Sequence, residues 1–187
     1  MKDVRIVVFG SGGVGKTKLC ERYICQIFVE KYDPNIEESY RKVFVVDGSS
    51  YVIELLDTAG TQQFTAMRDL YIKNANGIII VYSIISETSF TDVPDIHSTI
   101  LGVRSEKGWD NPPIIIAGNK IDLADKRVIS KESGEELANQ LGCAFLETSA
   151  KTPTNVDELF ETCGRMIIQH KYPTLPAKKK GGGCSLI

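Results

Sequence analysis

Residues Gly10-Ser11-Gly12-Gly13-Val14-Gly15-Lys16-Thr17 fit the pattern G-x-x-x-x-G-K-[ST], and the apolar run Val4–Phe9 precedes them. Such a run predicts a buried strand, and a helix is expected from Lys16 to about Cys25. A glycine-rich loop between a strand and a helix lets backbone N–H groups wrap a polyphosphate at the positive end of the helix. Lys16 would neutralise phosphate oxygens, and the Thr17 hydroxyl would be a ligand of Mg²⁺. The alternative, a glycine-rich turn with a chance lysine, would not require this strand–loop–helix context.

Strand signals recur along the rest of the chain. Asp47-Gly48 lies between Lys42–Val46 and Tyr51–Leu56 and is a strong hairpin signal. Short apolar runs predict further buried strands at Gly77–Tyr82, Ile114–Ala117 and Cys143–Leu146.

Helical spacing is found between and after these strands. Ser130 is a candidate N-cap for a helix that carries Leu137 and Leu141. One apolar stripe at steps of three and four residues predicts the last helix, through Val156, Leu159, Phe160, Cys163, Met166 and Ile167. Strands that alternate with helices predict an α/β fold with a mostly parallel sheet.

The length of 187 residues and the ordinary globular composition predict one domain, residues 1–170, and exclude a disordered or collagen-like chain. No membrane span and no signal peptide are expected. A flexible tail follows at residues 171–187, with four lysines and no acidic residue. Since the whole chain has a net charge of −2, the tail carries +4 and the domain −6. An acidic domain argues against a nucleic-acid binder, whereas a basic tail suits an anionic membrane.

The five cysteines are odd in number, and their spacing matches no zinc or disulfide pattern. Four of them lie within periodic segments and are predicted to be small buried core residues. These four are Cys20, Cys25, Cys143 and Cys163.

Two polar motifs follow predicted strands. Gly118-Asn119-Lys120-Ile121-Asp122 comes after Ile114–Ala117, and Thr148-Ser149-Ala150-Lys151 comes after Cys143–Leu146. Open α/β sheets bind ligands at the carboxyl ends of their strands. The Asp122 carboxylate can accept from N1–H and the 2-amino group of guanine, and adenine offers neither donor, so rejection can reach ~10⁴-fold. A lone Asn-Lys-x-Asp is more often a polar loop, but here it accompanies a phosphate loop and a Ser-Ala-Lys loop.

With these motifs in order, the chain resembles the Ras superfamily of small GTPases from Lys2 to about Ile168, and within it looks most like the Rap branch. The resemblance is carried by the runs Ile27–Pro34, Glu38–Lys42, Asp57–Thr61 and Gln63–Tyr71. It implies a P-loop fold with a six-stranded, mostly parallel sheet, one antiparallel edge strand and five flanking helices. It also implies a GTPase that switches between GDP and GTP and uses Mg²⁺, with switches at about residues 30–38 and 59–68.

The resemblance implies roles for individual residues. Ser149 would orient Asp122, the Ala150 N–H would bond the guanine oxygen, and Phe28 and the Lys120 stem would pack on the base. The Gly60 N–H would meet the γ-phosphate, and Asp57 would hold Mg²⁺ through a water. The implied nucleotide contacts are Ser11, Gly12, Gly13, Val14, Gly15, Lys16, Thr17, Lys18, Phe28, Tyr32, Asn35, Gly60, Asn119, Lys120, Asp122, Ser149, Ala150 and Lys151. The implied catalytic residues are Lys16, Gly60 and Thr61, and the implied metal ligands are Thr17, Asn35 and Asp57.

Two positions bear on the mechanism. The family has Thr where this chain has Asn35, and the Asn carbonyl lies one bond further out than a Thr hydroxyl. Because Mg²⁺ tolerates little departure from octahedral geometry, we expect incomplete closure of the first switch, unless Asn35 substitutes adequately. Thr61 replaces the Gln that orients water in most Ras relatives, although Thr is usual in Rap. We therefore predict intrinsic hydrolysis below ~10⁻⁴ s⁻¹, with a Rap-type activating protein supplying an Asn in trans.

Residues 30–42 are also predicted to bind partners. The acidic residues of this segment lead into a predicted edge strand at about Ser39–Lys42, which suits strand addition by a basic effector domain. The alternative is a merely solvated loop. By resemblance, an exchange factor is a further partner, and a monomer is expected.

The chain ends in Cys184-Ser185-Leu186-Ile187, a C-a-a-X pattern, with Lys178–Lys180 just upstream. A prenyl group on Cys184 and the lysines would together anchor the protein at the cytoplasmic face of the plasma membrane or an endomembrane. The final Ile favours geranylgeranyl over farnesyl, and the tail has no second cysteine for palmitoylation. An unmodified solvated tail is the alternative.

Three function classes follow. The first is a slow guanine-nucleotide switch. The second is a guanine-nucleotide-binding module whose switching is impaired by Asn35 and Thr61. The third, a P-loop phosphotransferase, is disfavoured because it would need an arginine-bearing lid, and Arg104 and Arg127 stand isolated in the sequence.

Overall fold

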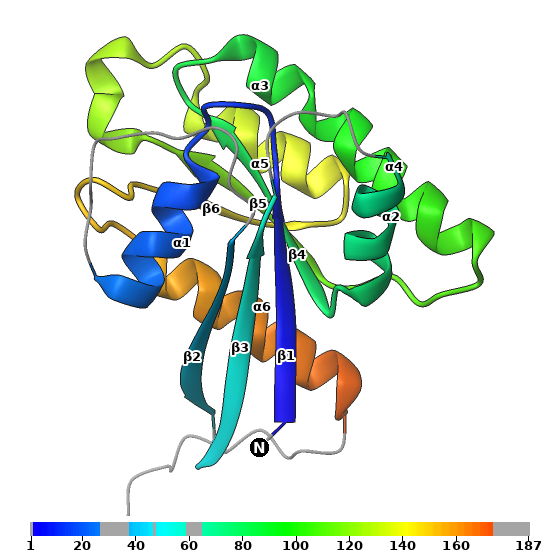
Figure 1. Cartoon of the computed structure of the whole chain (residues 1–187). Helices are drawn as coiled ribbons and strands as arrows, with labels where there is room; N and C mark the ends of the chain where they lie inside the picture. Colours follow the sequence, from blue (N-terminus) through cyan, green and yellow to red (C-terminus); the bar gives the residue numbers. More distant parts are fainter. Residues whose placement is uncertain (1, 27–37, 47, 59–64, 174–187) are drawn as a thin grey trace, which may run out of the picture.

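The computed structural model describes residues 2–26, 38–46, 48–58 and 65–173. Six strands form one sheet in the order β2-β3-β1-β4-β5-β6 (Figure 1). The strands are β1 (Lys2–Phe9), β2 (Glu38–Val46), β3 (Ser49–Asp57), β4 (Gly77–Ser83), β5 (Ile114–Asn119) and β6 (Ala144–Thr148). All neighbouring strands are parallel except β2 and β3. The predicted mostly parallel sheet with one antiparallel edge strand is confirmed.

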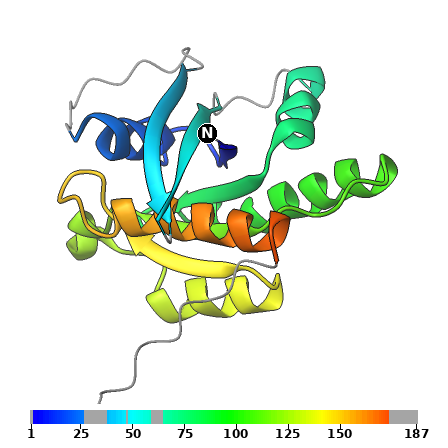
Figure 2. The same cartoon turned by 90° about the horizontal axis from the view of Figure 1, so that it is seen from below.

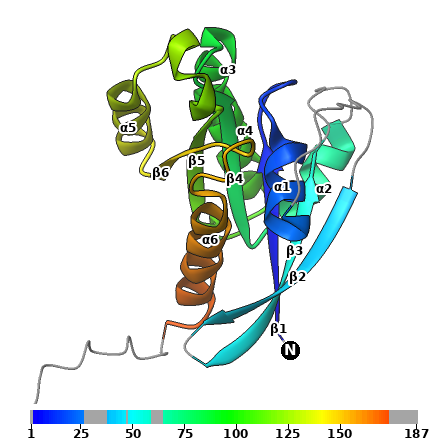
Figure 3. The same cartoon turned by 90° about the vertical axis from the view of Figure 1, so that its left-hand side faces the viewer.

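The β2–β3 hairpin is longer than the sequence patterns indicated. β2 is a single strand that pairs with β3 from Glu38 opposite Asp57 to Val46 opposite Ser49. The hairpin signal located the turn, where Gly48 has φ 77°, a conformation that favours glycine. Asp47 lies outside the described residues. Figure 3 shows the hairpin reaching the same end of the molecule as the last turn of helix α6.

The helices are α1 (Lys16–Cys25), α2 (Thr65–Asn74), α3 (Glu87–Thr91), α4 (Val93–Glu106), α5 (Lys131–Gln140) and α6 (Val156–Lys171), with a 3₁₀ helix η1 (Ile121–Lys126). The predicted bounds of α1 are confirmed. Ser130 caps α5 as predicted, because its Oγ accepts from the Ser133 N–H at 3.0 Å. Pro94 has no N–H for the helical ladder, and α3 ends and α4 begins just before it. Counted as one interrupted helix, α3 and α4 bring the α-helices of the described ranges to the expected five.

Two cores lie on opposite faces of the sheet. One contains Leu19 and Tyr23 of α1 with Phe160 and Ile167 of α6. The other contains residues of α2, α4 and α5, such as Ile72. Figure 2 shows α6 (orange) next to β6 (yellow). Because both faces are covered, β4 and β5 are buried along their whole length, and the ligand-binding edge is left to the loops after the strands.

One cysteine prediction is wrong. Cys20 and Cys163 are buried and Cys143 is half-buried, but Cys25 is exposed. Cys25 is the last residue of α1 and lies beyond the apolar face that packs on α6. Among the described residues, no helix combines the length and the apolar character that crossing a membrane requires.

Candidate functional site

The phosphate loop, residues 10–17, joins β1 to α1 at the top of Figure 1. Two of its positions need glycine for two reasons: a side chain would clash with neighbouring atoms, and the φ angle is one that favours glycine. A Cβ on Gly10 (φ 145°) would lie 2.2 Å from the Val81 carbonyl oxygen, and one on Gly15 (φ 99°) would lie 2.5 Å from Asn119 Nδ2. The loop is therefore packed against β4 on one side and against the residues that follow β5 on the other.

Lys16 is 5% exposed and holds its ammonium over the phosphate loop. Its Nζ donates to the carbonyl oxygens of Gly10 at 2.8 Å and Ser11 at 3.0 Å. Burial lowers the pKa of Lys16, and the negative charge of Asp57 acts in the opposite direction. A buried ammonium beside the uncapped N-terminus of α1 favours a ligand of strongly negative charge.

Thr17 and Asp57 come together from α1 and the end of β3. The Thr17 Oγ1 donates to Asp57 Oδ2 at 2.5 Å, and Asp57 is 1% exposed. Thr58 anchors this end of β3, because its Oγ1 donates to the Val8 carbonyl of β1 at 2.8 Å. Hydroxyl and carboxylate oxygens are the donor types that Mg²⁺ prefers, so these two residues fit a magnesium ion.

The first base loop, residues 118–127, is tied to the phosphate loop. Asn119 is 2% exposed, and its Nδ2 donates to the Val14 carbonyl at 2.8 Å. Lys120 Nζ donates to the Gly13 carbonyl at 2.6 Å. Burial lowers the pKa of Lys120, while Asp122 acts to raise it. The residues that would read the base are thus fixed relative to the residues that would hold the phosphates.

The second base loop, residues 148–155, contacts the first at two points. The Ser149 Oγ donates to Asp122 Oδ1 at 2.6 Å, the contact that the resemblance implied. The Thr148 Oγ1 donates to Asn119 Oδ1 at 3.2 Å. Both contacts place polar side chains from two neighbouring strand ends at one edge of the sheet.

The predicted site residues divide into two groups. The described ones lie together at the carboxyl ends of β1, β3, β5 and β6: Ser11, Gly12, Gly13, Val14, Gly15, Lys16, Thr17, Lys18, Asp57, Asn119, Lys120, Asp122, Ser149, Ala150 and Lys151. Lys18 forms an ion pair with Glu21 of the same helix, at 2.7 Å. The others lie outside the described residues: Phe28, Tyr32, Asn35, Gly60, Thr61 and Cys184.

Sequence reasoning missed several residues that hold the site. Arg22 of α1 donates through Nε to the Ala150 carbonyl at 2.8 Å. The Ser11 Oγ donates to Asp92 Oδ2 at 2.6 Å, which links the phosphate loop to the start of α4. No local pattern indicates these pairs, because 128 and 81 positions separate their members.

Arg104 and Arg127, isolated in the sequence, are not isolated in the fold. Arg104 Nη1 donates to the Ile72 carbonyl at 3.0 Å, near the end of α2. Arg127 forms an ion pair with Glu147, with Nη1 and Oε1 2.5 Å apart. Both arginines bind groups of the protein itself, which does not fit the arginine-bearing lid that a phosphotransferase would need.

One comparison with known proteins bears on this site. A sequence model described as the Ras family matches residues 5–169 of the chain. The match spans β1 to the last turn of α6 and includes all three loops described above.

Proposed function

Because this chain belongs to the Ras family of small GTPases, we propose that it binds GDP and GTP at the three loops and switches between them in signalling. The family membership implies a guanine nucleotide and Mg²⁺. One observation carries the assignment of the site: the first base loop donates through Asn119 and Lys120 to the phosphate loop, at 2.8 and 2.6 Å. A single ligand with a base at one end and phosphates at the other suits this arrangement.

Each part of the site has a task in this proposal. Lys16 and the first N–H groups of α1 would hold the β- and γ-phosphates. Thr17 and Asp57 would hold Mg²⁺, which supplies positive charge to the phosphate oxygens when bound. Asp122, held by Ser149, would accept from N1–H and the 2-amino group of guanine, and the Ala150 N–H would donate to the guanine oxygen.

We propose slow intrinsic hydrolysis. Thr61 is too short to orient water as a Gln does at this position in most Ras relatives, and Gln62 and Gln63 follow one and two places too late. An activating protein would supply the missing side chain, and the Rap-like sequence runs favour one of Rap type. Residues 59–64 lie outside the described residues, so this part of the proposal rests on sequence.

The test measures binding first and hydrolysis second. GDP and GTP are expected to displace a fluorescent guanine nucleotide at concentrations about 10⁴-fold lower than ATP requires. Single-turnover hydrolysis of bound GTP is expected below ~10⁻⁴ s⁻¹ without an activating protein. Equal displacement by ATP would contradict the base assignment, and a rate well above that value would contradict the role given to Thr61.

A second candidate is a guanine-nucleotide-binding module with impaired switching. It is favoured by Asn35, which stands where the family places a Thr that binds Mg²⁺. Loss of one ligand would loosen the first switch, so the GTP state would bind effectors little better than the GDP state. In either case we propose that effectors dock along residues 30–42 and that the tail, through Cys184 and Lys178–Lys180, holds the protein at a membrane.

A further inference from the structure

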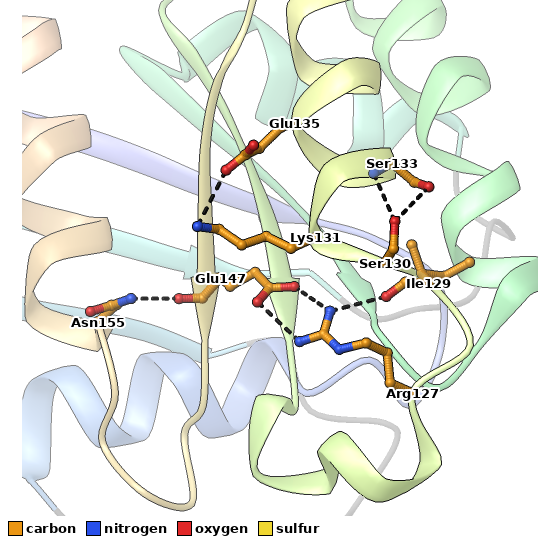
Figure 4. A network of polar contacts seen from close by, with 8 residues as sticks. All are labelled: Arg127, Ile129, Ser130, Lys131, Ser133, Glu135, Glu147 and Asn155. Atoms are coloured by element: carbon orange, nitrogen blue, oxygen red, sulfur yellow. Dashed lines mark hydrogen bonds and ion pairs between the residues drawn. The ribbon is translucent and has the colours of Figure 1, made fainter.

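Arg127 and Glu147 join the two base loops. Arg127 directly follows η1, and its two terminal nitrogens contact both carboxylate oxygens of Glu147 (Figure 4). The distances are 2.5 Å from Nη1 to Oε1 and 3.0 Å from Nη2 to Oε2. Arg127 Nη1 also donates to the Ile129 carbonyl at 3.0 Å. Arg127 and Glu147 therefore form a bidentate ion pair, which fixes the orientation of the two side chains as well as the distance between them.

Glu147 is placed to hold both ends of the second base loop. It lies on β6, one residue before Thr148, where that loop begins. Its backbone carbonyl accepts from Asn155 Nδ2 at 2.8 Å, and Asn155 is the residue at which the loop ends (Figure 4). The side chain of Glu147 therefore ties the first base loop to a residue whose backbone closes the second.

The pair is partly shielded from solvent. The Glu147 side chain is 11% exposed and that of Arg127 is 25% exposed. The hydrogen bond with Glu147 raises the pKa of Arg127, against the effect of burial. A shielded bidentate pair is stronger than the exposed ion pairs of this protein, such as Lys131–Glu135.

The pairing of β5 with β6 does not by itself join the two base loops. The β5–β6 ladder ends at Asn119 opposite Thr148, before Asp122 and Ala150 are reached. Beyond that point, Asp122 is held by Ser149 on one side, and η1 is held by Arg127 on the other. The chain after η1 is also fixed to the residue after β4, since the N–H groups of Val128 and Ile129 donate to the Ile84 carbonyl at 2.9 and 3.1 Å, and the Arg127–Glu147 pair adds the tie between η1 and the second base loop.

We infer that Arg127 and Glu147 are positioning residues for guanine recognition, which set the separation of Asp122 and Ala150 so that both can contact one base. The inference rests on the proposed function. N1–H, the 2-amino group and the oxygen lie side by side on one edge of guanine, so Asp122 and Ala150 can contact the base together only if the distance between them is fixed. The pair should therefore govern how long the nucleotide stays bound and how strictly the base is read.

The experiment compares dissociation of fluorescent GDP and fluorescent IDP, the analogue without the 2-amino group. The variants are Arg127→Gln, Glu147→Gln and the double variant. The matched control is Glu54→Gln, since Glu54 is 15% exposed and pairs with Arg5 and Arg41 on β1 and β2, away from the base loops. Thermal unfolding of each variant is measured in parallel.

Either single substitution should speed GDP release by about 10-fold, and the double variant by no more than the larger single effect. The rate of IDP release should change less than that of GDP release. The ratio of the IDP release rate to the GDP release rate should therefore fall towards one. Arg127→Lys, which keeps the charge and loses the bidentate contact, should lie between wild type and Arg127→Gln. The Glu54→Gln control should leave both rates unchanged.

Three results would overturn the inference in different ways. If the variants unfold more easily but keep the wild-type ratio of GDP to IDP release, the pair has only a structural role. If wild-type protein binds no guanine nucleotide, the proposed function fails and the inference fails with it. An unchanged rate in Arg127→Gln and Glu147→Gln would exclude positioning while leaving the proposed function intact.

Discussion

At the scale of single residues, the proposed recognition of guanine rests on Asp122. Ser149 donates to its Oδ1 at 2.6 Å and so holds the carboxylate in one orientation. Each carboxylate oxygen has two lone pairs, so this contact leaves acceptor capacity for the base. In the proposed function, selectivity for guanine would therefore depend on one side chain whose position is set by a neighbour 27 residues away.

Asp122→Asn should exchange this selectivity. The amide places a donor where the 2-amino group of guanine needs an acceptor, and affinity for GDP should fall about 100-fold or more. Xanthine carries an oxygen at that position, so xanthosine diphosphate should bind the variant better than GDP does. Asp125→Asn, in the same 3₁₀ helix, is the control and should keep wild-type affinities by titration calorimetry. A variant that still prefers GDP would contradict the role of Asp122.

At the scale of elements, α4 connects the phosphate loop with α2 (Thr65–Asn74). Asp92 at its start accepts from Ser11 of the phosphate loop, at 2.6 Å. Arg104 in its last turn is 8% exposed and donates to the carbonyls of Ile72 and Lys73 at the end of α2, at 3.0 and 3.3 Å. Arg104 also donates to the Asp110 carbonyl through Nε, at 2.8 Å. The C-terminal end of α2 is thus capped by a side chain from another helix.

Arg104→Met should loosen α2 specifically. The substitution keeps an apolar stem but leaves the carbonyls of Ile72 and Asp110 without their donor, which should cost about 2 kcal/mol in the free energy of unfolding. Amide hydrogen exchange should speed up near the end of α2, as measured by mass spectrometry, and urea unfolding gives the stability. Arg165→Met removes an exposed ion pair with Glu161 on α6 and should cost less than about 0.5 kcal/mol. If both variants lost the same free energy of unfolding, Arg104 would not stabilise the end of α2 more than an exposed ion pair does.

At the scale of the whole molecule, the nucleotide loops and the β2 edge belong to one sheet. β2 pairs with β3, and Asp57 at the end of β3 contacts Thr17 beside the phosphate loop. If a partner binds along β2 as proposed, one pair of strands would connect it with the residues beside the phosphate loop. In the proposed function, the difference between the two nucleotide states would depend on Asn35, which lies outside the described residues.

Titration of a Rap-type effector domain against both nucleotide states decides this question. A preference of about 100-fold, or 2.7 kcal/mol, for the state loaded with a non-hydrolysable GTP analogue is expected from a working switch. Near-equal weak binding would favour the module with impaired switching. In that case Asn35→Thr should restore the preference, because it returns a hydroxyl ligand of the correct reach to Mg²⁺.

Membrane attachment should depend on a single cysteine. Protein from eukaryotic cells should carry a prenyl group by mass spectrometry and sediment with vesicles that contain anionic lipid. Cys184→Ser should abolish both, whereas Cys25→Ser, at the exposed cysteine of α1, should change neither. Replacement of Lys178–Lys180 should weaken vesicle binding by about 1 kcal/mol per lysine. An unlipidated chain that still sediments would contradict the proposal.

Local sequence patterns located the six strands and helices α1, α5 and α6, but they did not indicate α2, α3 or α4 individually. The Gly10–Thr17 motif and its flanking apolar runs predicted a strand, a phosphate loop and a helix, because a loop that wraps phosphates needs these residues in consecutive order. Asp122 was predicted from the motif that follows the strand at Ile114–Ala117, and the role of Ser149, which directly follows β6, was implied by the resemblance. The contacts that hold these residues in place were decided by the tertiary structure alone. Arg22 with Ala150, Ser11 with Asp92, and Arg127 with Glu147 join residues 20 to 128 positions apart, and no local pattern records which of many polar surface residues will meet when the strands align. Cys25 illustrates the same limit, since periodicity placed it in a helix but only the packing of α1 on α6 decided that it faces solvent.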